Sequence, residues 1–332
     1  MQFHRAYQVV TPTNIAVLKY WGKQDAYLNL PVNSSISVTL HTDDLRTETT
    51  VVLDSSFTED RITLNGEETP LNERVKKVLH FAREMSIYEG KDCFIHINSR
   101  NTFPTAAGLA SSASGYCALA LAVIHVLKIE ASPYNKSFLA RIGSGSACRS
   151  LYGGVVAWEL TEKNDSISYQ IDNWELSVFI CIVSADKKKV SSTDGMNRTL
   201  ATSDLFKERK AIANERFEQF KDIVSNRDFE AFAELTMRDS NTFHALCLDS
   251  YPPIRFMNDT SHAIIDCVHH MNQACGRNVA CYTFDAGPNA VIFCLPSDAE
   301  LVENHLSVVL EFNNIQLLKT KTGTDPSDNE LL

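Results

Sequence analysis

Hydrophobic and polar positions in the first half of the chain predict strands interspersed with helices. Apolar and β-branched residues recur in short runs, which is typical of strands. These runs cover residues 35–40, 47–53, 61–64, 93–97, 155–160 and 178–184. Asn65 and Gly66 follow the third run and predict a tight hairpin turn.

Two segments of the first half show the pattern of a helix instead. Asn72 precedes a segment that runs to about Met85 and has apolar residues at 75, 78, 79 and 82 on one face. We therefore expect Asn72 to cap an amphipathic helix. Residues 109–127 are apolar on almost every face, which predicts a buried helix.

The second half of the chain is dominated by helical periodicity. Residues 203–224, 229–246 and 261–274 predict helices, and 279–284 and 290–295 predict strands joined by a tight turn. A closing helix over about 298–312 precedes a polar tail. We expect an α+β chain of two lobes, residues 1–186 and 187–332, in which the tail after about residue 318 is mobile.

Composition narrows the possible partners. The 332 residues carry a formal net charge of -10, which disfavours nucleic acid because binding its phosphates needs a basic face. Nine cysteines are scattered without a CxxC pair, as is typical of free thiols in a reducing compartment. The first residues contain no apolar signal core, and no run approaches the roughly 18 apolar residues of a membrane span. We expect a cytoplasmic protein with no membrane partner.

Small residues fill the segment 104–115, between a predicted strand and the buried helix. Free N–H groups and the positive end of the dipole at a helix N-terminus form an anion site. Ser111 and Ser112 add hydroxyls for phosphate oxygens or Mg²⁺. The segment contains neither the Gly-x4-Gly-Lys motif nor GxGxxG. A helix start that packs closely through small residues would have the same composition, so both interpretations stay open.

Three other segments contain residues suited to holding an anion or moving a proton. Lys19 and Lys23 lie four apart in KYWGK, although solvated lysines at a strand end would look the same. Gly and Ser alternate before Arg149, whose guanidinium can hold a carboxylate with two parallel bonds. A flexible turn is the alternative there. Asp285 ends a predicted buried strand, where it either caps the turn or faces a pocket.

The segment 104–114 resembles the nucleotide loop of the GHMP family, whose pattern is Pro-x3-Gly-Leu-Gly/Ala-Ser-Ser-Ala/Ser. KYWGK, GSGSACRS and TFDAGPNA stand around it in an order similar to that of the mevalonate diphosphate decarboxylase family, as do LPVNSSIS, VSST, RDSN and CLDSYPP. The resemblance covers roughly residues 8–295. It implies a GHMP kinase fold, with an N-terminal lobe like ribosomal protein S5 domain 2, a ferredoxin-like C-terminal lobe, and a homodimer.

The resemblance also implies the residues of the site. The catalytic residues would be Lys19, Ser144, Arg149 and Asp285. The substrate would contact Lys19, Tyr20, Trp21, Gly22, Lys23, Arg74, Ser144, Gly145, Ser146, Ala147, Cys148, Arg149 and Thr193. ATP would contact Pro104, Ala107, Gly108, Leu109, Ala110, Ser111, Ser112, Ser114 and Lys188, or in place of Lys188 one of its neighbours Lys187 and Lys189, and Ser112 would reach Mg²⁺. Arg149 would hold the substrate carboxylate, and Asp285 would act on its C3 hydroxyl.

The activity implied is the ATP-dependent conversion of (R)-5-diphosphomevalonate to isopentenyl diphosphate, CO2, ADP and phosphate, in isoprenoid and sterol biosynthesis. Three alternatives stay open. One is a GHMP kinase of the phosphomevalonate kinase or mevalonate 3-kinase type, which stops after phosphoryl transfer. The others are a decarboxylase of mevalonate monophosphate and a scaffold that binds ATP without turnover. Polar residues at 262, 266, 269 and 270 suggest zinc only weakly, because an amphipathic helix explains them.

Overall fold

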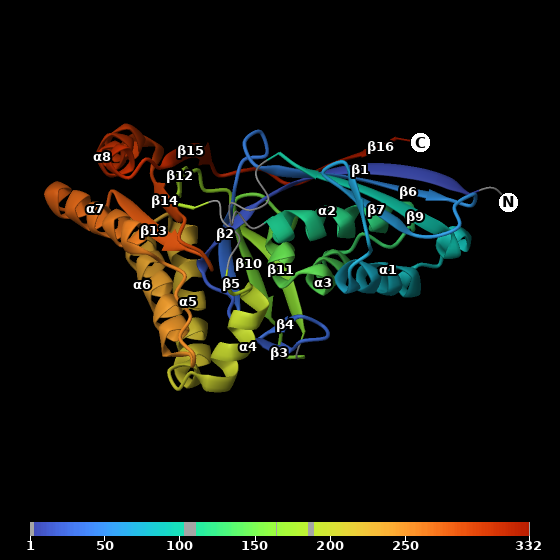
Figure 1. Ribbon diagram of the computed structural model, residues 1–332, viewed down its shortest axis with the longest axis horizontal. Coiled ribbons are helices and arrows are strands. Elements are labelled where there is room, and N and C mark those ends of the chain that lie inside the picture. Colours follow the sequence, from blue (N-terminus) through green and yellow to red (C-terminus); the bar gives the residue numbers. More distant parts are fainter. Residues whose placement is uncertain (1–2, 103–110, 164, 185–188, 332) are drawn as a thin grey trace.

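The computed structural model describes residues 3–331 apart from 103–110, 164 and 185–188. A broad sheet with its helices occupies one end of the elongated molecule, and a layer of longer helices occupies the other (Figure 1). Both termini lie beside the broad sheet, in which the last strand of the chain pairs with the first.

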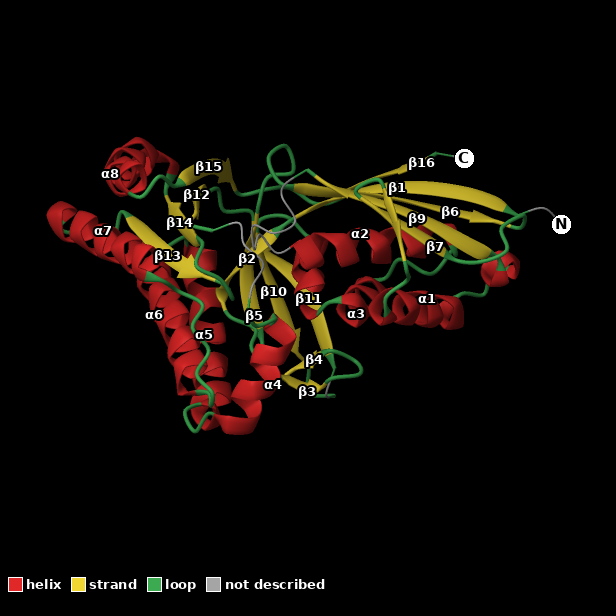
Figure 2. Cartoon of the chain, viewed as in Figure 1, coloured by secondary structure: helices red, strands yellow, loops and turns green. Residues whose placement is uncertain are grey.

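The broad sheet has six strands in the order β16-β1-β6-β9-β7-β8 (Figure 2). Its strands are β1 (His4–Pro12), β6 (Arg46–Asp54), β7 (Arg61–Leu64), β8 (Glu67–Thr69), β9 (Phe94–Asn101) and β16 (Ser327–Glu330). Buried and half-buried residues alternate along β6, as they do in a sheet that is covered on one face. The predicted hairpin at Asn65 and Gly66 joins β7 to β8.

Helix α2 (Ser111–Val126) covers the inner face of this sheet. It is buried on most of its faces because α1 (Glu73–Met85) and α3 (Pro133–Gly143) pack against it from the other side. Asn72 caps α1 as predicted, and its side chain accepts hydrogen bonds from the backbone N–H groups of Arg74 and Val75, both at 3.0 Å.

A second sheet, in the order β11-β10-β5-β2, connects the lobes. Its strands are β2 (Asn14–Leu18), β5 (Ser35–Thr39), β10 (Val155–Leu160) and β11 (Ser166–Asp172). Every residue of β2 and β5 is buried. The reason is that α5 (Phe206–Asn226) and α6 (Phe229–Asp249) pack against these strands from the C-terminal lobe, while the short helix η2 (Gly145–Leu151) packs from the N-terminal lobe.

The C-terminal lobe contains a third sheet in the order β13-β14-β12-β15, with the long helices against it. Its strands are β12 (Ser177–Ile182), β13 (Ala280–Phe284), β14 (Ala290–Cys294) and β15 (Gln316–Lys321), and its further helices are α4 (Ser192–Thr202), α7 (Asp259–Cys275) and α8 (Ala299–Phe312). Helix α7 begins with reciprocal capping between Asn258 and Ser261 and ends at Gly276, whose φ is 64°. Among the described residues, no helix has the length and apolar character needed to cross a membrane.

The predicted α+β class and its two lobes are confirmed, with two differences. Helix α4 was not predicted, because its sequence is polar apart from a few positions. The segment after residue 318 was expected to be a mobile tail, but β15 pairs with β12 and β16 pairs with β1, so it connects both lobes. The predicted boundary at 186/187 lies outside the described residues and stays a prediction, although β12, which precedes it, belongs to the third sheet.

Candidate active site

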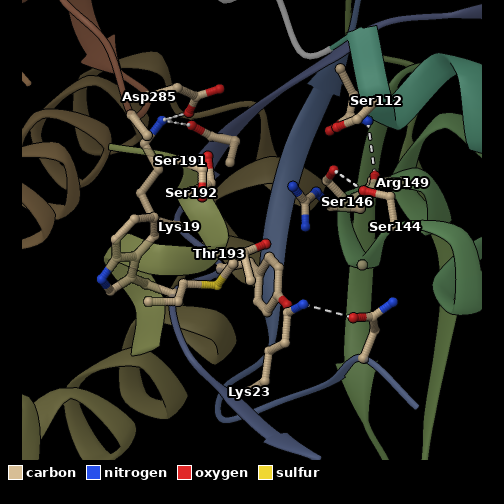
Figure 3. Close-up of a pocket in the computed structure, with 18 of the residues that line it drawn as sticks. Lys19, Lys23, Ser112, Ser144, Ser146, Arg149, Ser191, Ser192, Thr193 and Asp285 are labelled. Atoms are coloured by element: carbon tan, nitrogen blue, oxygen red, sulfur yellow. Dashed lines mark hydrogen bonds and ion pairs between the residues drawn. The ribbon is translucent and has the colours of Figure 1, made fainter. Parts of the chain in front are cut away.

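A cavity of about 360 Å³ lies where the two lobes meet. Segments that are far apart in the sequence form its wall, and Figure 3 shows Lys19 and Asp285 on one side and Ser144, Ser146 and Arg149 on the other. The described residues that line it are Asn14, Ala16, Lys19, Tyr20, Trp21, Lys23, Asn29, Arg74, Ser112, Ser144, Gly145, Ser146, Arg149, Ser191, Ser192, Thr193, Met196, Phe243, Asp285 and Ala286.

Lys19 and Asp285 form an ion pair at the wall of this cavity. The Lys19 Nζ atom lies 2.6 Å from Asp285 Oδ1 and donates a second hydrogen bond to the carbonyl oxygen of Ala16, also at 2.6 Å. The lysine side chain is 4% exposed, whereas that of the aspartate is 34% exposed and reaches the cavity. Burial lowers the pKa of Lys19, and the neighbouring Asp285 carboxylate opposes that shift.

Arg149 comes from η2 on the facing wall. It is buried, donates from Nη1 to Ser35 Oγ at 2.7 Å, and lies 5.9 Å from the centre of the Trp158 ring. Burial lowers the pKa of Arg149 to about 10, so the guanidinium is still charged at neutral pH. A carboxylate in the cavity would meet a fixed cation there.

Lys23 and Arg74 add positive charge to a further part of the wall. Lys23 donates to Asn29 Oδ1 at 2.7 Å, and Arg74, at the start of α1, donates to Thr193 Oγ1 in α4 at 3.1 Å. Burial, together with the charges of Arg74 and Lys77, lowers the pKa of Lys23 to about 8. Four basic side chains and one carboxylate therefore belong to the described lining, which favours an anionic ligand.

Three buried polar atoms of the lining residues have no hydrogen-bond partner among the described residues. They are the Tyr20 hydroxyl, Asn14 Oδ1 and Arg149 Nε. The amide nitrogen of Asn14 is bound to Ser146 O at 3.1 Å and Ser150 Oγ at 2.8 Å, which fixes the orientation of its oxygen. Buried polar atoms in native proteins are rarely left unpaired, so these three atoms are suited to a polar ligand.

A second cavity, of about 200 Å³ and mainly apolar, adjoins the first at Ser112. Its described lining comes from the sheet and the helices α1 and α2: Thr49, Ile62, Leu64, Asn72, Val75, Ile97, Ser99, Asn101, Ser111, Ser112, Gly115, Tyr116 and Leu119. Ser111 and Ser112, the first described residues of α2, lie where the two cavities meet, and a helix start offers N–H groups to an anion. An anion joined to a flat apolar group fits this arrangement.

Comparison with known proteins gives the family. Residues 11–170 match the model of the diphosphomevalonate decarboxylase-like N-terminal domain, and residues 178–330 match that of the mevalonate 5-diphosphate decarboxylase C-terminal domain. The chain belongs to the diphosphomevalonate decarboxylase family. The family predicted from the sequence motifs is thereby confirmed.

Relatives of this family resemble the chain over nearly its whole length. The diphosphomevalonate decarboxylase of Schizosaccharomyces pombe is 48% identical over an alignment of 337 positions, which covers 96% of this chain and 85% of the relative. The solved mevalonate diphosphate decarboxylase from Trypanosoma brucei has a TM-score of 0.90 at 34% identity, with 98% of each chain covered. A structure described as MDDEF in complex with MVAPP, AMPPCP and magnesium has a TM-score of 0.88 at 33% identity, and covers 99% of this chain and 100% of that one. The GHMP kinase fold is thus confirmed.

The cavity brings together most of the residues that the decarboxylase motifs predicted. Those that line it are Lys19, Tyr20, Trp21, Lys23, Arg74, Ser112, Ser144, Gly145, Ser146, Arg149, Thr193 and Asp285. Ser111 lines the second cavity. Six predicted nucleotide contacts, Pro104, Ala107, Gly108, Leu109, Ala110 and Lys188, lie outside the described residues.

Four predicted contacts of the decarboxylase site lie behind the wall instead. The Ser114 hydroxyl is buried against Thr47 Oγ1 at 2.7 Å. Ala147 and Cys148 are fully buried, and burial raises the pKa of the Cys148 thiol to about 12. Gly22 has a φ of 99°, and a Cβ atom there would lie 2.8 Å from the Phe206 ring, so its role is to let the backbone turn after Trp21.

Several lining residues were not predicted. Ser191 and Ser192 lie in VSST, and Asn14 lies five residues before KYWGK, so proximity to these motifs was the signal available for them. Asn29, Met196 and Phe243 come from a loop, α4 and α6, and no local pattern connects them with the site. The predicted zinc alternative has no support, since the described residues contain no group of three or more possible ligands.

Proposed function

We propose that this protein catalyses the ATP-dependent decarboxylation of (R)-5-diphosphomevalonate to isopentenyl diphosphate, with release of CO2, ADP and phosphate. The observation that carries this proposal is the position of the Lys19–Asp285 ion pair opposite Arg149, in a cavity rich in basic side chains. The family assignment supports the same reaction.

Each part of the substrate has a matching group in the cavity. The diphosphate fits Lys23 and Arg74, which supply two cations, and the Tyr20 hydroxyl supplies a further donor. The carboxylate fits Arg149 on the facing wall. The tertiary hydroxyl between these two ends then falls near Asp285, the one carboxylate in the described lining.

Asp285 acts on the tertiary hydroxyl as a general base. The C3 oxygen attacks the γ-phosphorus of ATP and its proton passes to the Asp285 carboxylate. Lys19, at 2.6 Å, fixes this carboxylate and balances its charge while the proton is absent. The bond from C3 to oxygen then breaks, phosphate leaves, and positive charge develops at C3.

Loss of the carboxylate completes the reaction. The electron pair of the bond between C2 and the carboxylate carbon forms the new double bond, and CO2 is released. Arg149 holds the carboxylate so that this bond can align with the departing phosphate, and Ser35 in turn fixes the guanidinium. Ser144 and Ser146, whose hydroxyl oxygens lie 3.3 Å apart, supply further donors on this wall.

We further propose that ATP lies across the two cavities, with its base in the apolar one and its phosphates at the start of α2. The described residues contain no group of three or more metal-binding side chains, so Mg²⁺ would be held mainly by the phosphates, with Ser112 as the available hydroxyl. Bound Mg²⁺ would neutralise charge on the phosphoryl group during its transfer. A homodimer, taken from the family resemblance, and a cytoplasmic location, taken from the composition, also stay proposals.

Release of labelled CO2 tests the proposed reaction. The protein is incubated with Mg²⁺ and substrate labelled in its carboxylate, with and without ATP. We expect release only with ATP, and a much lower kcat/KM for mevalonate monophosphate, which offers Lys23 and Arg74 less charge. Faster turnover of the monophosphate would contradict the substrate assignment, and absence of CO2 with either compound would contradict the reaction.

A further inference from the structure

The segment RDSN, residues 238–241, carried part of the family resemblance but contributes no side chain to the described lining of the cavity. It lies in α6, behind the Lys19–Asp285 pair. Asp239 and Ser240 are both almost fully buried there. They bind the backbone of the two segments that carry the ion pair.

Asp239 binds the backbone of Lys19 itself. Its Oδ2 atom accepts a hydrogen bond from the Lys19 N–H at 2.7 Å. Ser240, the next residue, accepts a hydrogen bond at 3.1 Å from the N–H of Phe284, the residue directly before Asp285. Two neighbouring residues of α6 therefore bind backbone N–H groups at Lys19 and directly before Asp285.

Arg209 binds both Asp239 and the backbone of Lys19. It is fully buried, donates from Nη1 to Asp239 Oδ1 at 2.6 Å, and donates from Nη2 to the carbonyl oxygen of Lys19 at 2.7 Å. Asn33 donates to the same carbonyl oxygen at 3.0 Å. Both backbone polar groups of Lys19 are thus bound to side chains that are themselves fixed.

Asp239 is ionised in this position. Burial raises its pKa, but Arg209, the N–H of Lys19 and Arg216 together lower it by more. Arg216 donates a hydrogen bond to Asp239 Oδ1 at 2.7 Å. A buried cluster of this kind is not needed for stability alone, because well-packed apolar residues often serve equally well. Apolar residues could not bind the N–H and C=O groups of Lys19.

We propose that Asp239, Ser240 and Arg209 are positioning residues that fix the Lys19 ammonium relative to the Asp285 carboxylate during turnover. This inference rests on the proposed function. Small displacements of reacting groups can slow an enzyme by about two orders of magnitude. The hydrogen bonds from α6 therefore act on the rate of the chemical step rather than on the binding of substrate.

Ser240→Ala is the mildest test, because it removes one hydroxyl and leaves the ion cluster intact. Ser137→Ala is its matched control: Ser137 is also a buried helical serine, and it accepts a strand N–H, that of Ser168, at 2.8 Å, but in the other lobe. We expect Ser240→Ala to lower kcat for CO2 release about tenfold with KM changed less than about threefold. Ser137→Ala should keep kcat within about twofold of the native value. Equal kcat values for the two variants would overturn the inference.

A double-mutant cycle tests whether Ser240 acts through Asp285. The low rate of the Asp285→Asn variant is measured in long incubations with labelled substrate. In that variant, Ser240→Ala should lower the remaining rate less than about twofold. The same tenfold loss in both backgrounds would mean a general structural defect and overturn the inference. If the native protein itself releases no CO2, the proposed function fails and the inference fails with it. Native activity with unchanged Ser240→Ala activity overturns the inference alone.

Discussion

Arg149 Nη1 donates a hydrogen bond to Ser35 Oγ at 2.7 Å, which ties the guanidinium of η2 to strand β5. The arginine is 3% exposed and the serine is fully buried, so the bond lies inside the protein wall. It fixes one end of a planar fork that belongs to the lining of the cavity. The cavity thus contains a cation with a set orientation before any ligand binds.

Arg149→Lys tests whether this orientation matters. Lysine keeps the positive charge but cannot hold a carboxylate through two parallel bonds. We expect kcat for CO2 release to fall at least about a hundredfold, equivalent to about 2.7 kcal/mol of activation free energy. Arg141→Lys is the control, because Arg141 is equally buried but pairs with Asp165 away from the cavity. A rate for Arg149→Lys within about threefold of the native rate would show that charge alone suffices.

Asp285→Asn removes the proposed base and keeps the size of the side chain. We expect kcat to fall by at least about three orders of magnitude, because the amide cannot take a proton from the tertiary hydroxyl. The KM of the substrate should change little, since Lys23, Arg74 and Arg149 stay in place. A decrease in kcat of less than about tenfold, near 1.4 kcal/mol, would contradict the role of base.

Lys23 should give the reaction a distinct dependence on pH. Its pKa is lowered to about 8, first by burial and then by Arg74 and Lys77, so the free protein loses this cation as the pH rises above that value. We expect kcat/KM to decline above pH 8 because the diphosphate then meets less positive charge. Lys23→Met should lower kcat/KM at neutral pH and remove this decline.

Lys76→Met is the control for Lys23, since Lys76 lies on the exposed face of α1 and pairs with Glu73. It should keep the native profile. An identical alkaline decline in the native protein and Lys23→Met would assign the titration to another group.

Asn72 caps the helix that carries Arg74, and its removal should reduce stability. Its Oδ1 atom accepts hydrogen bonds from the N–H groups of Arg74 and Val75 and, at 3.1 Å, from the Tyr116 hydroxyl. We expect Asn72→Ala to lower the free energy of unfolding by about 1 kcal/mol, as measured by urea denaturation. Ser132→Ala, which removes the single cap bond of α3, should cost less. The reverse order of the two losses would contradict the importance of this cap.

The correctly predicted elements are those whose structure depends on residues close together in the sequence. The cap and apolar face of α1, the turn at Asn65 and Gly66, and the apolar α2 are all visible within about one helix length of sequence. Helix α4 was not predicted because its few buried residues, among them Met196, pack on Trp21 and its neighbours, which lie far away in the sequence. Strand β16 is wholly polar, and Leu317 and Leu318 are the only apolar residues of β15, so no hydrophobic pattern predicts these strands, which pair with β1 and β12.

The residues of the site also divide into those that a local motif predicts and those that depend on distant contacts. Lys19, Arg149 and Asp285 were identifiable because each stands in a motif that resembles the family. The motif around Asp239 also carried the resemblance. Its contact with Lys19, however, spans 220 positions, and no pattern in the sequence predicts it. Contacts between segments so distant become visible only in the folded chain.

The ratio of CO2 to ADP tests the central claim most directly. Native protein, ATP, Mg²⁺ and carboxyl-labelled (R)-5-diphosphomevalonate are mixed, and both products are measured in the same quenched samples over time. A decarboxylase in which phosphoryl transfer prepares the leaving group predicts equal amounts of ADP and CO2 at every late time point. ADP without CO2 would contradict the account and indicate a kinase that stops at the phosphate ester.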